Sequence, residues 1–269
     1  VWHAGQHREV VQAISGLHTK GLLKTYSRAV YRYTLPYLSM KFDRAQRQQM
    51  LVGHYDFLNR ALHASFFRCV LSDAMTLWQR EIDGSVFAIS VGGPCPHREG
   101  DLTLVFTMDG CPLYRMAFSV VKSPLLNVSA GPSSHVLYVG QVQGYPDRFA
   151  QIRQATRLCR DVAPADLLMA GMAGLASALG ISTVAGVGVE NSLSYQSLVE
   201  LNTSTSYADF WEKFQGIRAE GGHYLLGLPL VEKPISLIKA NHRGRTLAKR
   251  ELKKSVSEEA ASVMRPLVL

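Results

Sequence analysis

Long apolar runs are absent from this chain of 269 residues. Its longest apolar region, around Leu167–Leu179, is interrupted by Gly171, Gly174 and Ser177 and is shorter than the roughly 18 apolar residues that a membrane-spanning helix needs. The opening residues also lack a basic segment followed by an apolar one, so no secretory signal is expected. We therefore expect a cytoplasmic protein, with peripheral attachment to the inner membrane as the alternative.

Cysteine pairs and metal-ligand clusters are also missing. The cysteines lie far apart and form no Cys-x-x-Cys pair, as expected of reduced thiols in a reducing compartment. His3 and His7 have the spacing of two ligands on one helix face, but no third ligand stands near them. The sequence therefore predicts neither a disulfide framework nor a metal site. The cysteines are Cys69, Cys95, Cys111 and Cys159.

General catalytic signatures do not occur. The chain has no Ser-His-Asp order, paired carboxylate motif, Walker loop or complete GxGxxG fingerprint. Gly186 and Gly188 stand within an expected strand rather than at a strand-to-helix turn, which argues against dinucleotide binding. No reaction can therefore be assigned from a general motif.

What the chain does contain is the composition of a globular protein with a substantial core, with 47% hydrophobic and 19% charged residues. Hydrophobic residues recur three and four apart over residues 6–80, which predicts helices there, and Asp43 is the expected N-cap of a helix that runs to Phe57. From residue 81 the period changes to that of strands. Asp109 and Gly110 predict a tight hairpin turn, because glycine tolerates a positive φ. The first expected strands are 86–91, 102–108, 113–121 and 135–142.

The later segments alternate between helix and strand. Helices are expected at 147–159, 164–179 and 207–214, strands at 182–189 and 223–228, and a long basic helix from residue 235 onward. The predicted fold is α+β, with a helical N-terminal layer, a central mainly antiparallel sheet and a basic C-terminal helix. These parts are residues 1–80, 81–230 and 231–269, and we expect them to form one compact unit.

The net charge of +8 is concentrated near the C-terminus. A basic face attracts anionic lipid headgroups, phosphorylated ligands or nucleic acid, and of these we expect a membrane surface sooner than nucleic acid. The alternative is a solvated helix whose charges only keep the protein soluble. The residues expected to face an anionic surface are Lys239, Arg243, Arg245, Lys249 and Arg250.

A series of longer motifs is more specific. It consists of RQQMLVGHYDFL (residues 47–58), YVGQVQG (138–144), IRQATR (152–157), PADLL (164–168), LGISTVAGVGVEN (179–191), YADFW (207–211) and GHYLLGLP (222–229). In content and order the series resembles the VirK/YbjX family of bacterial proteins, over roughly residues 25–260. The resemblance implies association with envelope stress, resistance to cationic antimicrobial peptides and virulence in Gram-negative bacteria, but no established activity. Family members often have a histidine after the GV strand, whereas this chain reads NSLSYQS over residues 191–197.

The expected order of elements is also similar to that of Gcn5-related acyltransferases. In that fold a helix after the fourth strand presents backbone N–H groups to the pyrophosphate of an acyl-CoA, which would make acyl-CoA the cofactor. Arg153 and Arg157 lie four residues apart on one helix face and could hold phosphate oxygens. However, Tyr145-Pro146 occupies the place of the expected Gln/Arg-x-x-Gly-x-Gly/Ala turn. The expected ligand-binding residues are Gln141, Gln143, Gly144, Arg153, Thr156, Arg157 and Asn191.

His54 and Tyr55 are the expected acid–base pair, because histidine titrates near neutrality. The alternative is a helix-end histidine that packs against the sheet. Asp209 is a further catalytic candidate or, alternatively, an ion-pair partner of the basic tail. Gln141 and Gln143 alternate along their strand, so both amides should face the same side, toward a pocket or solvent.

Two functions remain open at this level. The first is an acyltransferase-like enzyme that acts on a small-molecule, envelope-related or peptide substrate. The alternative is a non-enzymatic factor that binds anionic lipid or nucleic acid through its basic helix. A preformed polar cleft beside Gln141, Gln143 and Arg153 would favour the enzyme, because a surface-binding factor does not need one.

Overall fold

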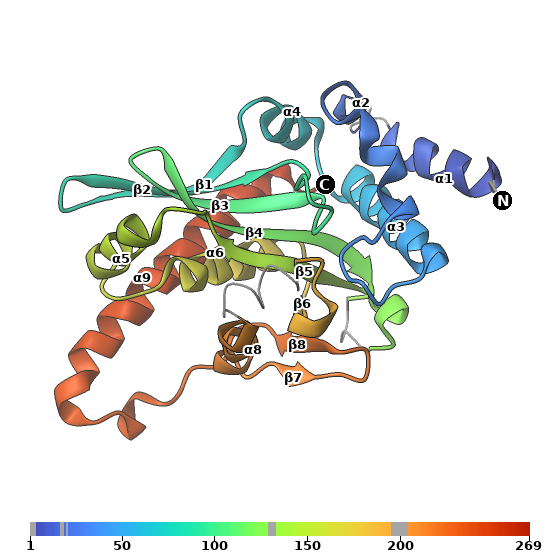
Figure 1. The fold of residues 1–269 in the computed structure, drawn as a ribbon. Coiled ribbons are helices and arrows are strands. Elements are labelled where there is room, and N and C mark those ends of the chain that lie inside the picture. Colours follow the sequence, from blue (N-terminus) through green and yellow to red (C-terminus); the bar gives the residue numbers. More distant parts are fainter. Residues whose placement is uncertain (1–3, 17–18, 20, 129–132, 195–203) are drawn as a thin grey trace.

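The structure is a computed structural model that describes residues 4–16, 19, 21–128, 133–194 and 204–269. Its strands are β1 (Met75–Ile82), β2 (Ser85–Gly92), β3 (Leu102–Met108), β4 (Cys111–Lys122), β5 (His135–Gly144), β6 (Thr183–Val187), β7 (Ile217–Arg218) and β8 (His223–Gly227). In the described part of the chain they form one eight-stranded sheet in the order β1-β2-β3-β4-β5-β6-β8-β7 (Figure 1). All neighbours are antiparallel except β5 and β6, which run parallel. The mixed α/β fold and the mainly antiparallel sheet are therefore confirmed.

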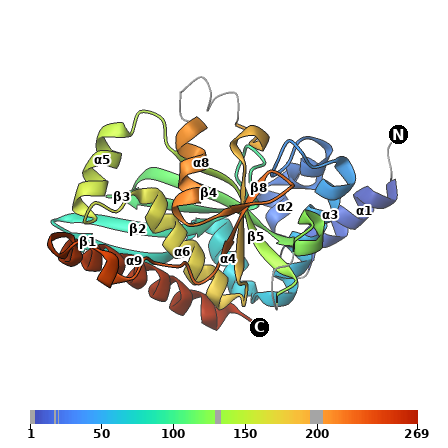
Figure 2. The same cartoon turned by 90° about the horizontal axis from the view of Figure 1, so that it is seen from below.

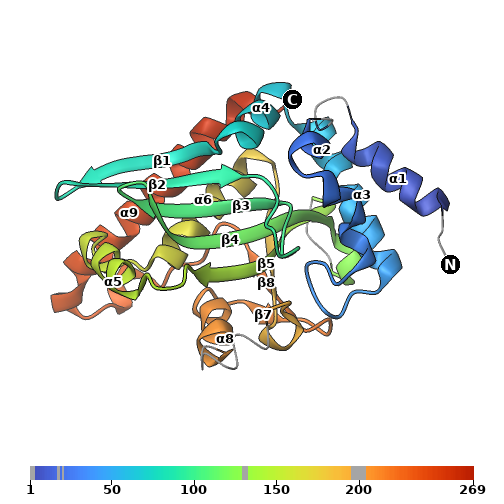
Figure 3. The same cartoon turned by 45° about the horizontal axis from the view of Figure 1, so that its top comes forward.

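Helices cover the sheet and one of its ends. They are α1 (Ala4–Ile14), α2 (Leu22–Thr25), the 3-10 helix η1 (Ser27–Thr34), α3 (Arg44–Ala61), α4 (Ala64–Ser72), α5 (Phe149–Leu158), α6 (Pro164–Ala178), α8 (Ser204–Lys213) and α9 (Ala240–Met264). The helices α6 and α9 pack together along the sheet, with α6 against β3, β4 and β5 and α9 against β1 (Figure 2). The N-terminal helices α1 to α3 gather at one end of the sheet, whereas α5 and the start of α9 lie at the other (Figures 1 and 3). Within the residues described, no helix has the length and apolar character needed to cross a bilayer.

The predicted hairpin between β3 and β4 is present. Asp109 and Gly110 have φ values of 51° and 75°, the left-handed conformation that a two-residue hairpin turn requires. The strands pair directly on either side of the turn, with Met108 opposite Cys111. A carboxylate oxygen of Asp109 also accepts a hydrogen bond from the backbone N–H of Val86 at 2.7 Å, which ties the turn to β2.

The strand β1 occupies residues that we expected to be helical. It begins at Met75, before the boundary predicted at residue 81, and pairs with β2. Its register shifts between Thr76 and Trp78, so Leu77 and Trp78 are both buried although they are adjacent. This irregularity removes the strict alternation of apolar and polar residues by which a strand is recognised, which explains the missed prediction.

The boundaries of two helices can be compared with the boundaries predicted from local sequence. Asp43 is the N-cap of α3, as predicted, and forms a capping box with Gln46: the Gln46 N–H donates to the Asp43 carboxylate at 2.8 Å. This helix continues beyond Phe57 to Ala61. The basic C-terminal helix begins at Ala240 rather than at residue 235.

Candidate functional site

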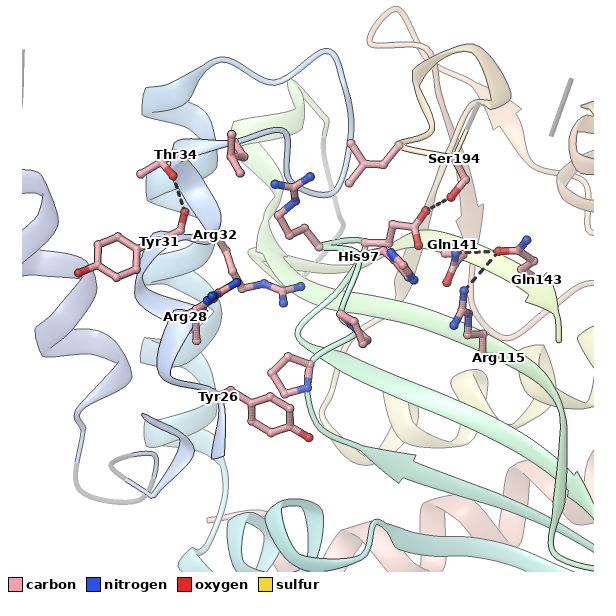
Figure 4. Close-up of a pocket in the computed structure, with 17 residues that line it drawn as sticks. Tyr26, Arg28, Tyr31, Arg32, Thr34, His97, Arg115, Gln141, Gln143 and Ser194 are labelled. Carbon is pink, nitrogen blue, oxygen red and sulfur yellow. Dashed lines mark hydrogen bonds between the residues drawn. The ribbon is translucent and has the colours of Figure 1, made fainter. Parts of the chain in front are cut away.

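A polar cleft of about 890 Å³ lies between η1 and the strands β4 and β5 (Figure 4). Arg28 and Arg32 line it from η1, and Arg115, Gln141 and Gln143 line it from the strands across the cleft. The loop between β2 and β3 completes the wall. This volume is within the range of about 300–1,000 Å³ that is typical of small-molecule sites.

Irregular backbone borders the cleft. The ladder between β4 and β5 pairs Val139 and Gln141 with consecutive residues of β4 and leaves Gly140 out, which makes Gly140 the extra residue of a β-bulge. The strand β6 pairs only with Leu137–Val139, so the second half of β5 has no registered partner on that side. A Cβ atom on Gly140 would lie 2.2 Å from the carbonyl oxygen of Glu99. Glycine is therefore required for the β2–β3 loop to approach the bulge.

Glu99 is the carboxyl group of the cleft wall. Its side chain is buried, the hydroxyl of Ser194 donates a hydrogen bond to Oε1, and Oε2 has no hydrogen-bond partner among the described residues. Burial raises the pKa of Glu99 to about 7, although the Ser194 hydrogen bond and the charge of Arg115 oppose the rise. This carboxyl can therefore gain or lose a proton near neutral pH.

Gln141, Gln143 and Arg115 form a connected polar wall. The amide of Gln141 donates to Oε1 of Gln143 at 2.9 Å, and Nη2 of Arg115 reaches the same oxygen at 3.5 Å. The thiol of Cys95 donates to Oε1 of Gln141 at 3.8 Å. Both glutamines therefore point to the same side of β5, into the cleft.

A second carboxylate, Asp101, lies behind the cleft in a fully buried network. It accepts hydrogen bonds from the hydroxyls of Tyr37, Tyr55 and Ser119, the last two at 3.0 and 3.2 Å, and lies 3.2 Å from Nε of Arg32. Burial opposes its ionisation, yet the charge of Arg32 and the hydrogen bonds hold the pKa of Asp101 below its ordinary value. Asp101 is therefore ionised at neutral pH and holds its partners in place.

Arg32 connects this network to the cleft wall. Its two terminal nitrogens donate to the carbonyl oxygens of Cys95 and Gly100, both at 2.9 Å. The guanidinium thus fixes the loop that carries Glu99 from both ends. Because Arg32 also lines the cleft, its position sets that of the neighbouring carboxyl.

The structure places the expected acid–base pair away from the cleft. His54 is fully buried; its Nδ1 accepts a hydrogen bond from the backbone N–H of Val120 at 3.0 Å, and burial lowers its pKa to about 4. Tyr55 donates to Asp101, and burial raises its pKa well above its ordinary value. At neutral pH both side chains are uncharged and enclosed in the core.

The remaining predicted ligand-binding residues also lie outside the cleft lining. Arg153 and Arg157 are exposed on α5, and the Thr156 hydroxyl donates to a backbone carbonyl within the same helix. Gly144 ends β5, and Asn191 donates to the carbonyl of Gly222 at 3.3 Å. Asp209 is exposed on α8, whereas the side chain of its neighbour Tyr207 lies outside the described residues. Of the predicted set, the structure brings together Gln141 and Gln143.

The basic C-terminal residues are partly matched by acidic side chains. Arg245 forms an ion pair with Asp161, and Arg250 forms one with Glu232 at 2.8 Å. These pairs reduce the positive field that the helix presents to a surface. The predicted surface residues without an ion pair in the described part of the chain are Lys239, Arg243 and Lys249.

A second cavity, of about 1310 Å³, lies between α6, α9 and residues 228–230. Small apolar side chains such as Ala170, Ala173 and Ala248 line it, and the Glu232–Arg250 pair stands at its edge. It is larger than the polar cleft, and charged side chains such as Asp166, Lys254 and Glu258 line it together with the apolar ones. No set of three or more histidine, cysteine or acidic side chains among the described residues is placed to hold a metal ion.

The sequence predicted only some of the residues that line the cleft. Arg32, Glu99 and Arg115 belong to no recognised motif, although the segment CPHREGD (residues 95–101) shows an unusual density of charge between two expected strands. A charged cluster in a loop held by two strands is a reasonable signal of a binding site. Its partners are distant in sequence, so the cluster alone could not identify Glu99.

Fold and cleft together define an α/β protein with one open sheet and a polar, ligand-sized cleft at a bulged strand. Residues 1–254 match the family described as "Protein of unknown function (DUF535)", and the chain therefore belongs to that family. This is the VirK/YbjX family, so the resemblance seen in the motifs is confirmed. No curated protein and no solved structure matches the chain.

Proposed function

We propose that this protein is an acyl-transfer enzyme whose acceptor substrate binds in the polar cleft and gives its proton to Glu99. The observation that carries the proposal is a buried carboxyl with a pKa of about 7 and an unpartnered Oε2 at the wall of that cleft. A general base is most effective when its pKa lies near the working pH. Burial without a full set of partners is how enzymes commonly produce such a carboxyl.

The strand order supports this class of reaction. The strands β2 to β5 form an antiparallel meander, β6 lies parallel to β5, and β8 inserts between β6 and β7. In this proposal we equate this arrangement with the order of elements in Gcn5-related acyltransferases. The bulge at Gly140 and the parting of β6 from β5 lie beside the cleft, and bulges near active sites commonly reorient side chains or end strand pairing.

In the proposed step, the lone pair of an acceptor amine or hydroxyl forms a bond to the acyl carbon of a thioester donor. The bond between that carbon and sulfur breaks, and the sulfur keeps the electron pair. Glu99 takes the proton that the acceptor loses and can pass it to the departing thiolate.

An acyl-CoA would supply the acyl group together with a negatively charged diphosphate. The charges at the start of α5 are compatible with a bound anion. The first turn of α5 has no acidic residue, and its N-cap residue, Arg148, makes no side-chain cap. Arg153 and Arg157 are exposed on the same helix. Unpaired N–H groups at a helix start favour phosphate. The preceding turn contains Tyr145-Pro146 rather than the expected glycines, so the fit concerns charge rather than a close backbone approach.

The test is the variant Glu99→Gln, which keeps the shape of the side chain but cannot accept a proton. Thiol release from acetyl-CoA is measured with a panel of primary amines and hydroxyl compounds. We expect the wild-type rate to rise with pH through about 7, because Glu99 must be deprotonated, and the variant to lose roughly 100-fold or more in kcat. Glu81→Gln, an exposed position on β1, is the matched control. Full activity of Glu99→Gln would exclude this residue as the base.

A further inference from the structure

The cleft carries more positive charge than nearby carboxylates neutralise. The arginines that line it are Arg28, Arg32, Arg98 and Arg115. Arg32 is matched by Asp101 behind the wall. In the part of the chain that the structure describes, no carboxylate lies within ion-pair distance of the other three. Glu99 is the acidic residue of the lining, so an excess of at least two positive charges remains whether or not it is ionised.

Arg115 is positioned to receive an anion. Its guanidinium lies 5.4 Å from the centre of the Tyr145 ring and touches Gln143 at 3.5 Å, so its orientation is fixed from two sides. Its Nε is buried and has no hydrogen-bond partner among the described residues. A guanidinium that is held in place with unused donors matches the oxygens of a carboxylate or phosphate in a forked geometry.

Arg98 reaches the cleft from a strained backbone. Its φ is 64°, the left-handed region, which a residue with a side chain rarely adopts. Two backbone hydrogen bonds hold it there: its carbonyl accepts from the Leu38 N–H at 3.0 Å, and its N–H donates to Cys95 at 3.2 Å. Such a conformation is energetically unfavourable and occurs preferentially at functional sites. Here it places an arginine directly before Glu99.

We infer that the acceptor substrate is a small molecule with a doubly charged phosphate group, which binds in the cleft with Arg115 as its direct partner, is attracted there by the charges of Arg28 and Arg98, and directs its nucleophile toward Glu99. A phosphate monoester carries close to two negative charges near neutral pH and offers three acceptor oxygens. A monocarboxylate would leave at least one of the excess positive charges unmatched. The assignment of this ligand as the acyl acceptor rests on the proposed function, whereas the phosphate site itself does not.

The probe is inorganic phosphate, titrated into the full chain by calorimetry at low ionic strength. Replacing Arg28, Arg98 and Arg115 together by Gln should weaken binding at least tenfold. The matched control replaces Arg8, Arg68 and Arg265 by Gln. These arginines are exposed and lie outside the cleft, and their replacement removes the same total charge. Phosphate binding should therefore change less than twofold. Equal weakening in both triple variants would mean that phosphate responds only to net charge. Absence of saturable binding to wild type, or tighter binding of succinate than of phosphate, would also overturn the inference.

Two further measurements separate this inference from the proposed reaction. Glu99→Gln removes a negative charge from the cleft, so it should bind phosphate at least as tightly as wild type while transfer is lost. If Glu99→Gln transfers acyl groups normally but the cleft arginines still govern phosphate binding, the proposed reaction fails and the anion site stands. If transfer needs Glu99 but phosphate binding ignores the cleft arginines, the inference fails. Arg28→Gln alone, at an exposed position, should weaken binding about threefold and keeps the test valid if the triple variant unfolds.

Discussion

Glu99 and Asp101 belong to the same loop, are both buried, and behave oppositely. Asp101 has three hydroxyl donors and an arginine, and its pKa stays below the ordinary value. Glu99 has one hydroxyl donor and an unpartnered oxygen, and its pKa rises to about 7. The comparison shows that the partners supplied to a buried carboxyl, rather than burial itself, decide whether its pKa lies above or below the ordinary value.

The largest effect should come from removing the charge of Asp101. Asp101→Asn leaves the guanidinium of Arg32 buried without its counter-charge, and we expect a loss of about 3–5 kcal/mol in the free energy of unfolding. Urea unfolding at neutral pH measures this. Glu99→Gln, in the same loop, should unfold at the same urea concentration as wild type or a higher one. Equal destabilisation by both changes would erase the contrast between the two carboxyls.

A smaller effect is expected from one of the donors. Tyr55→Phe removes the hydroxyl that binds the Asp101 carboxylate at 3.0 Å, and a buried hydrogen bond to a charged group contributes about 1.5–3 kcal/mol. Tyr31→Phe is the control, since Tyr31 is 46% exposed. Its unfolding free energy should stay within about 0.5 kcal/mol of wild type. A loss in Tyr55→Phe no larger than in the control would show that Asp101 does not depend on this donor.

The smallest expected effect is on the pH dependence of the free energy of unfolding, to which the two carboxyls contribute in opposite directions. The pKa of Glu99 is raised from 4.5 to about 7, so the folded state holds this proton more tightly than the unfolded state. Its contribution is present in full below the unfolded pKa and is lost as pH rises through about 7. The depressed pKa of Asp101 has the opposite consequence: its contribution is present above the unfolded pKa and is lost as pH falls through the folded one.

We therefore expect the stability of wild type relative to Glu99→Gln to fall by on the order of 1–2 kcal/mol between about pH 5 and about pH 8. Urea titrations of both proteins at several pH values give this difference, in which the contributions of the histidines cancel. A difference that does not vary with pH would show that the Glu99 carboxyl titrates alike in the folded and unfolded chain.

Elements specified by neighbouring residues could be predicted from the sequence. The Asp109–Gly110 turn and the Asp43 cap depend on residues within one turn of each other, and both are present. The strand β1 was missed because a register shift, set by pairing with β2, conceals its alternation. Local patterns were therefore sufficient to predict most elements, but not β1, whose irregular register is set by its pairing with β2.

The site was harder to predict because long-range packing creates its chemistry. The alternation of Gln141 and Gln143 indicated a shared face, and both line the cleft. The pKa of Glu99, in contrast, is raised by enclosure among distant segments, against the opposing hydrogen bond from Ser194. No local pattern shows that His54 is completely enclosed. Histidine ordinarily titrates near neutrality, which suggested acid–base catalysis, but burial lowers the pKa of His54 to about 4.

Arg32 also has a consequence for how the protein opens. This residue belongs to η1, yet its ion pair and both of its terminal hydrogen bonds go to the loop of residues 95–101. If the N-terminal helices detached from the sheet, Arg32 and Asp101 would each lose the opposite charge. Partial opening of the protein is therefore unfavourable. We therefore expect the N-terminal layer and the cleft loop to unfold as one cooperative unit, and a fragment that begins after η1 would lack both a wall of the cleft and the counter-charge of Asp101.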